Sequence, residues 1–277
     1  MQEFLGLMPA RWVALLVALL TALTLVETWI GHYRSGFPLR AQYAPFASGG
    51  LLILASVTAV GVPTSGAAST LLRGAGWLAI AVGIVGVAYH HYFGIVEKAG
   101  GYRWLLHYLM YGAPQLAPLS LSAAGALAVL ASQAIPGRSP LAGAATGRGM
   151  LGVVSAGLAG AVLQAGILHY RGAFNTPLMY LPLAVPPFAA LAAGWLAVAP
   201  LHAPTIAPLG VATRVLLWLT FIVGFVGLGM HLRGLDRQMG GLRVFLFNLL
   251  QGPPPLAPAV FAGFAAVGLI ALRLIGI

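Results

Sequence analysis

Residues 91–118 read HYFGIVEKAGGYRWLLHYLMYGAPQLAP, and their pattern returns at residues 231–258, which read HLRGLDRQMGGLRVFLFNLLQGPPPLAP. The two stretches share an opening histidine, a Gly-Gly-x-Arg element, a Gly-x-Pro element and a closing Leu-Ala-Pro. They align without a gap. Several matching elements at one constant spacing indicate that the chain contains an internal repeat.

A second repeated element lies earlier in each half, at a slightly shorter spacing. It combines a polar position, a histidine, an arginine and two aromatic positions. The matched pairs are Glu27 with Gln164, His32 with His169, Arg34 with Arg171, Phe37 with Phe174 and Tyr43 with Tyr180. The two sets of matches together predict a tandem duplication, with one unit at residues 1–138 and the second at residues 139–277.

The composition is that of a membrane protein. Hydrophobic residues make up 60% of the chain and charged residues 6%, and the mean hydropathy is +0.95. Soluble domains carry roughly 25% charged residues. Arginine outnumbers lysine, which occurs once, at Lys98, and alanine, glycine and leucine are abundant. We take this bias to indicate a bacterial protein, and we expect a multi-pass protein of the bacterial cytoplasmic (inner) membrane.

Eight continuously apolar runs predict eight transmembrane helices, because a helix needs about 20 mostly apolar residues to span a bilayer. The runs cover residues 12–30, 44–63, 75–93, 116–134, 150–168, 180–199, 212–230 and 256–275. A β-barrel would show alternating strands of about ten residues instead. The predicted fold class is therefore an all-α integral membrane protein, built as a tandem parallel repeat of two four-helix units.

An even number of helices per unit threads both units through the membrane in the same direction. The first and third helices of each unit then end on one face, which we call the histidine face because His32, His91, His169 and His231 lie at those ends. After the third and seventh helices, paired glycines precede short apolar segments such as residues 102–111. We expect these segments to form short interfacial helices.

The four repeated histidines are the strongest candidates for a ligand site. Neutral imidazole binds haem iron and transition metals, and pairing His32 with His91 and His169 with His231 gives each unit two ligands from different helices. Arginines near them in the sequence are candidates to bind haem propionates, namely Arg34, Arg103, Arg171, Arg233 and Arg243. The alternative is that these histidines only contact lipid headgroups and helix-terminal carbonyls.

Glu27 is the acidic residue that lies clearly inside a predicted span. Ionisable groups at membrane depth are costly, so they mark candidate functional sites. We expect Glu27 either to relay protons toward a quinone or to accept a hydrogen bond from a histidine ring nitrogen. The matching Gln164 favours a third role, an interhelical hydrogen bond that needs only polarity.

These patterns favour a membrane subunit of an electron-transfer system, which binds haem b or a quinone at the histidine face and couples to an extramembrane protein partner. A transporter or channel is one alternative, and it would place Glu27 in a central cavity. A catalytically silent anchor or assembly subunit is another. The net charge of +10 comes from scattered arginines, which suit anionic lipid headgroups and argue against nucleic-acid binding. Without cysteine, disulfides and thiolate ligands are excluded.

Overall fold

The computed structural model describes residues 8–135, 140–200 and 205–277, and all the regular secondary structure in these ranges is helical. In the first half the elements are α1 (Pro9–Arg34), η1 (Arg40–Tyr43), α2 (Ala44–Gly61), α3 (Gly66–His91), the π-helical η2 (Tyr92–Val96), η3 (Gly101–Trp104), α4 (Leu105–Tyr111) and α5 (Leu119–Ala134). In the second half they are α6 (Pro140–Arg171), η4 (Pro177–Tyr180), α7 (Leu181–Ala184), α8 (Pro186–Val198), α9 (Ile206–Asp236), η5 (Gly241–Val244), α10 (Phe245–Gln251) and α11 (Ala259–Leu274). The predicted boundary between residues 138 and 139 falls outside the described ranges.

Within the described residues, six helical segments are long and apolar enough to cross a membrane, as expected of a multi-pass membrane protein. They are Pro9–Arg34, Arg40–Gly61, Gly66–Val96, Ala144–Arg171, Pro177–Val198 and Ile206–Asp236. The remaining two predicted runs, 116–134 and 256–275, contain the shorter apolar helices α5 and α11, each of 16 residues. Both begin directly after a proline, Pro118 or Pro258, because proline lacks the N–H that a position further inside a helix would donate.

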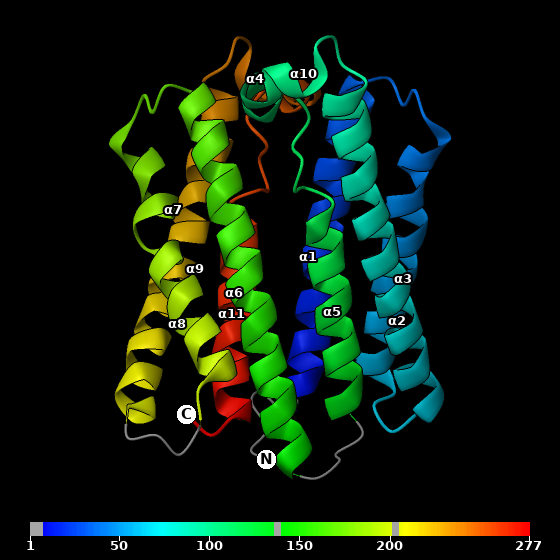
Figure 1. Ribbon diagram of the computed structural model, residues 1–277, viewed down its shortest axis with the longest axis vertical. Helices are drawn as coiled ribbons and strands as arrows, with labels where there is room; N and C mark the ends of the chain where they lie inside the picture. The colour runs from blue at the N-terminus through cyan, green and yellow to red at the C-terminus, as the bar shows by residue number, and fades with distance from the viewer. Residues whose placement is uncertain (1–7, 136–139, 201–204) are drawn as a thin grey trace.

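Four long helices run in the same direction (Figure 1). α1, α3, α6 and α9 end beside the short helices α4 and α10, and the start of α1 and the C-terminus lie near the opposite end of the bundle. α5 packs along α3 and α11 packs along α9, while α1 contacts α11 and α5 contacts α6 across the middle of the molecule. All the repeated histidines therefore lie toward the end that carries α4 and α10.

The segments predicted to be short helices after residues 101 and 241 are indeed helical. Each forms one 3-10 turn followed by a seven-residue α-helix, η3 with α4 and η5 with α10. The preceding Gly100 and Gly240 have φ angles of +79° and +81°, a left-handed conformation that glycine adopts without steric cost. The repeated Gly-Gly pair thus reverses the chain at the same point in each half.

Close packing between α3 and α5 depends on small residues. A Cβ atom added to Gly76 would lie 2.7 Å from the backbone oxygen of Gly125 and 2.9 Å from Val129. The neighbouring Gly74 has no such neighbour within 4 Å. Small residues let membrane helices approach closely, so Gly76 sets the distance between these two helices.

Replacing Gly76 with alanine is expected to destabilise the protein by about 1–3 kcal/mol, because overpacking forces the backbone of α5 to move. Gly74→Ala, two residues away on the same helix, serves as the matched control and should leave stability unchanged or slightly raised. Thermal unfolding in detergent, followed by circular dichroism, measures both. Equal melting temperatures for the two variants would contradict this account of the contact.

Candidate functional site

The chain turns back after α1 and again after α6, and each turn anchors a histidine. His32 donates from Nδ1 to the carbonyl of Gln42 at 3.2 Å, and His169 donates from Nδ1 to the carbonyl of Met179 at 2.6 Å. In both cases the acceptor lies ten residues further along, within a 3-10 helix. The same contact therefore orients the imidazole in each half.

An aromatic pair supports each of these turns. The ring of Phe37 meets His32 edge-on with centroids 5.7 Å apart, and Phe37 stacks on Tyr43 at 4.9 Å. In the second half Phe174 lies 6.2 Å from His169 and stacks on Tyr180 at 4.5 Å. These contacts hold Phe37 and Phe174 in place although both have positive φ angles, which are uncommon for residues other than glycine.

A second anchored histidine comes from α3 and from α9. His90 donates from Nδ1 to the carbonyl of Pro114 at 2.9 Å, and His231 donates from Nδ1 to the carbonyl of Pro254 at 2.7 Å. Both carbonyls belong to the Gly-Pro segments that precede α5 and α11. A carbonyl only accepts hydrogen bonds, so in the neutral imidazole each Nδ1 carries the proton and each Nε2 keeps its lone pair.

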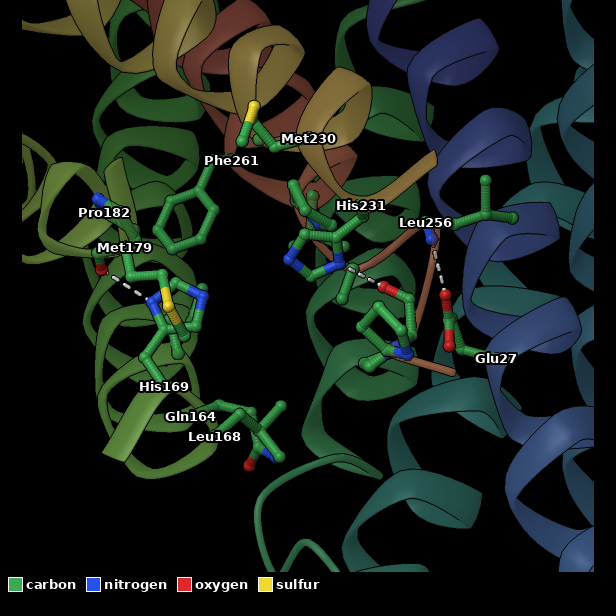
Figure 2. A pocket seen from close by; sticks show the side chains of 18 of the residues that line it. Glu27, Gln164, Leu168, His169, Met179, Pro182, Met230, His231, Leu256 and Phe261 are labelled. Atoms are coloured by element: carbon green, nitrogen blue, oxygen red, sulfur yellow. Dashed lines mark hydrogen bonds between the residues drawn. The ribbon is translucent and has the colours of Figure 1, made fainter. Parts of the chain in front are cut away.

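These four histidines form two pairs of nearly identical geometry. The ring centroids of His32 and His90 are 6.4 Å apart with an interplanar angle of 53°. Those of His169 and His231 are 6.3 Å apart at 57°. Figure 2 shows the second pair on opposite sides of a gap, each ring directing its second nitrogen at the other.

The predicted pairing of His32 with His91 differs from the structure. The Nε2 atom of His91 lies 2.7 Å from the hydroxyl of Tyr102, and it is His90 that faces His32. A Cβ added to Gly86 would lie 2.8 Å from Cβ of Pro118, and one added to Gly227 would lie 2.8 Å from Cβ of Pro258. Gly86 and Gly227 are therefore equivalent, and they are one position further apart in the sequence than His91 and His231.

The first half thus contains one additional residue near the end of α3. The π-helical turn η2 accommodates it, since a π turn has a wider hydrogen-bonding span than an α turn. An alignment without a gap consequently pairs His231 with His91, although His90 is the residue in the equivalent position. The Gly83-x-x-Gly86 and Gly224-x-x-Gly227 elements have the same wider spacing as His90 and His231, and they are the signal that identifies His90.

The second histidine pair lines a cavity of about 1120 Å³, formed mainly by α6, α9, α11 and the segment before α11. Its wall is mostly apolar and includes Leu168, Met179, Met230 and Phe261 (Figure 2). The charged and amide side chains that line it include Glu27, Gln164, Arg171, Arg233, Arg237 and Gln251. Arg237 lines the cavity although it was not among the predicted site residues.

Glu27 lies in the wall of this cavity. Its Oε1 atom accepts a hydrogen bond from the backbone N–H of Leu256 at 2.6 Å, just before the N-terminus of α11. A carboxylate is favoured at that position because the N-terminal end of a helix carries partial positive charge. Glu27 therefore connects α1 of the first half to the start of α11 in the second.

Of the five predicted arginines, Arg233 lines the cavity, and the other four divide into two groups. Arg171 at the end of α6 donates to the carbonyls of Met110 and Gly112, the latter at 3.0 Å. Arg34 at the end of α1 donates to the carbonyls of Leu249, Leu250 and Gly252. Each half thus supplies an arginine to the C-terminal end of the short helix of the other half. Arg103 and Arg243 lie on η3 and η5 and are exposed.

The fold and the site together define an all-helical, multi-pass type of membrane protein with two anchored histidine pairs near one end of the bundle. Comparison with known protein families, with curated proteins and with solved structures finds no significant match to this chain. The chemistry of the site therefore rests on its own residues.

Proposed function

We propose that this protein is a membrane electron-transfer subunit that holds haem b between His169 and His231. The observation that carries the proposal is the pair of facing imidazoles, each with Nδ1 bound to a backbone carbonyl and Nε2 directed at its partner (Figure 2). Histidines that bind metals characteristically donate their other ring nitrogen to such an acceptor, which fixes the tautomer and the orientation of the ring.

The separation of the two rings suits ligands on opposite sides of one iron atom. A metal–imidazole bond is about 2.0 Å, and a ring nitrogen lies about 1.2 Å from the centre of its ring, so two opposed imidazoles have centroids roughly 6.4 Å apart. The value for His169 and His231 is 6.3 Å. Imidazoles that share a tetrahedral ion lie closer together than this.

The site provides two histidine ligands, and this number suits haem better than it suits a bare metal ion. A mononuclear zinc site takes three or four protein ligands, whereas a porphyrin supplies four nitrogens of its own and needs two axial ligands. Across the described residues, no group of three or more His, Cys, Asp or Glu side chains is placed to hold a metal ion. Two histidines alone are the set that a six-coordinate haem requires.

The cavity supports the same assignment. Its mostly apolar wall suits a macrocycle, and its volume of about 1120 Å³ exceeds that of many small-molecule sites. Arg233 and Arg237 line it and are exposed, so they are suited to bind carboxylate groups of a ligand. When bound, haem supplies one-electron redox chemistry, and the protein supplies ligands, charge and exclusion of water.

The proposed membrane arrangement has eight spans, in two parallel four-helix repeats at 1–138 and 139–277. α5 and α11 complete their crossings through the Gly-Pro segments that precede them. α4 and α10 lie in the interface, which is supported by the exposed aromatic side chains of Tyr102 and Trp104 beside α4. The histidine face then offers the haem to a partner protein, and the compositional bias suggests the bacterial inner membrane.

A quinone is the alternative redox ligand of the cavity, because the side-chain amide of Gln164 in the cavity wall is a donor suited to one of its carbonyl oxygens. A transporter is the second candidate function. It is favoured by one observation, the presence of Glu27 and Gln164 in the cavity wall, since parallel repeats commonly place a solute site between them.

An optical spectrum of the purified full-length protein tests the proposal. We expect a Soret band in the oxidised protein and, after reduction with dithionite, the sharp visible bands of a six-coordinate low-spin haem b. A protein that purifies without haem from cells supplied with a haem precursor, and that does not bind added haemin, would refute it. Extractable quinone in the absence of haem would favour the quinone, and solute-dependent flux in vesicles would favour a transporter.

A further inference from the structure

The first half contains the same set of anchored imidazoles as the second. His32 and His90 have ring centroids 6.4 Å apart at 53°, against 6.3 Å and 57° for His169 and His231. All four Nδ1 atoms bond to backbone carbonyls at equivalent places, and no described residue bonds to an Nε2 atom of the four. His32 and His90 do not line the cavity that contains His169 and His231.

We propose that His32 and His90 are the axial ligands of a second haem, so that the full chain binds two. The inference rests on the proposed function of the His169–His231 site. It assigns a ligand role to His90 and a structural role to His91, contrary to the alignment of the sequence repeat.

The π turn explains how the site is preserved despite the additional residue. From Gly83 to His90 the first half matches the second at a spacing of 141 positions, and from Gly94 onward at a spacing of 140. Because η2 takes up the difference, the carbonyl of Pro114 still reaches His90 as that of Pro254 reaches His231. Both ends of the hydrogen bond thus stay in place while the intervening chain differs, as expected if the orientation of His90 is functional.

The surroundings of the two pairs differ in the side chains that face them. Phe46 lies 6.4 Å from His32 and 6.2 Å from Phe37, so the first pair has an aromatic cluster at its edge. The position that matches Phe46, at the spacing that relates His32 to His169, is Leu183. Two haems in such unlike surroundings are expected to differ in reduction potential, which makes them distinguishable within one chain.

The test measures haem per chain in the purified full-length protein, with haem quantified by the pyridine haemochrome method and protein by amino-acid analysis. We expect two haems per wild-type chain and two low-spin signals in electron paramagnetic resonance. His32→Ala and His90→Ala should each retain one haem. His91→Ala is the matched control, one residue from His90, and should retain two.

The outcomes separate the two proposals. One haem per wild-type chain, lost in His231→Ala and kept in His90→Ala, would overturn the second site and leave the proposed function intact. No haem in the wild-type protein would overturn both. Two haems with loss of one in His91→Ala instead of His90→Ala would overturn the ligand assignment. The wild-type stoichiometry decides for or against the second site even if the His90 variant does not fold.

Discussion

His169→Ala and His231→Ala are each expected to abolish the six-coordinate low-spin haem spectrum of the His169–His231 site. Each substitution removes one of two axial ligands, and the partner imidazole is held by its own backbone carbonyl at 2.6 or 2.7 Å. The remaining histidine therefore cannot move to replace its partner. The measurement is the reduced-minus-oxidised difference spectrum of each variant, at equal protein concentration.

A matched control and a rescue experiment separate ligand loss from misfolding. His107 on α4 contacts only the rings of Tyr108 and Tyr111 among the aromatic contacts of the described chain, so His107→Ala should keep the wild-type spectrum. Free imidazole added to His169→Ala should restore the six-coordinate spectrum, because the deleted side chain leaves space of that size. An unchanged spectrum in both alanine variants would show that neither imidazole is a ligand.

Arg171→Ala is expected to lower the free energy of unfolding by about 3 kcal/mol, since a hydrogen bond from a charged donor contributes roughly 1.5–3 kcal/mol and a partly buried guanidinium makes two here. The substitution leaves the carbonyls of Met110 and Gly112 without this donor. It also removes a cation from the C-terminal end of α4, where the helix dipole favours positive charge. Arg34→Ala should have a smaller effect because Arg34 is exposed.

Two further variants show whether the stabilising effect of Arg171 comes from the geometry of its hydrogen bonds or from its charge. Arg171→Lys should recover only part of the lost stability, because an ammonium group does not reproduce the planar fork of donors of a guanidinium. Arg243→Ala removes an exposed arginine at the short helix of the second half and should change stability by less than about 0.5 kcal/mol. Chemical unfolding in detergent measures all of them. Equal losses for Arg171→Ala and Arg243→Ala would exclude the proposed link between the halves.

Much of the local structure could be predicted from the sequence. Continuous apolar runs, with Gly100 and Pro118 as markers of a turn and of a helix start, predict the order of the helices but not their ends. α3 and α6 begin nine and ten residues before the runs that predict them, while α5 and α11 are shorter than their runs. Prolines in those runs keep the first residues out of the helix, and hydropathy alone does not predict this later start.

The candidate site was only partly predictable. His32, His169 and His231 emerge from the repeat, and the structure brings His169 and His231 together as expected. The sequence does not indicate His90 as a site residue, because the match of His91 with His231 conceals a one-residue insertion. Arg34 and Arg171 both donate to backbone carbonyls of the opposite half, which the sequence did not predict, and Arg171 also lines the cavity.

The amino-acid order alone is thus sufficient to establish an all-helical membrane protein with histidines near the ends of its helices, because run length, glycine and proline act over a few neighbouring residues. Three-dimensional packing was needed to show that His90 faces His32 and that Glu27 meets Leu256. The first contact is hidden from the sequence alignment by a single extra residue, which lies after His90 and which the π turn η2 accommodates. The second joins two halves of the chain that lie far apart in the sequence, so no local pattern records it.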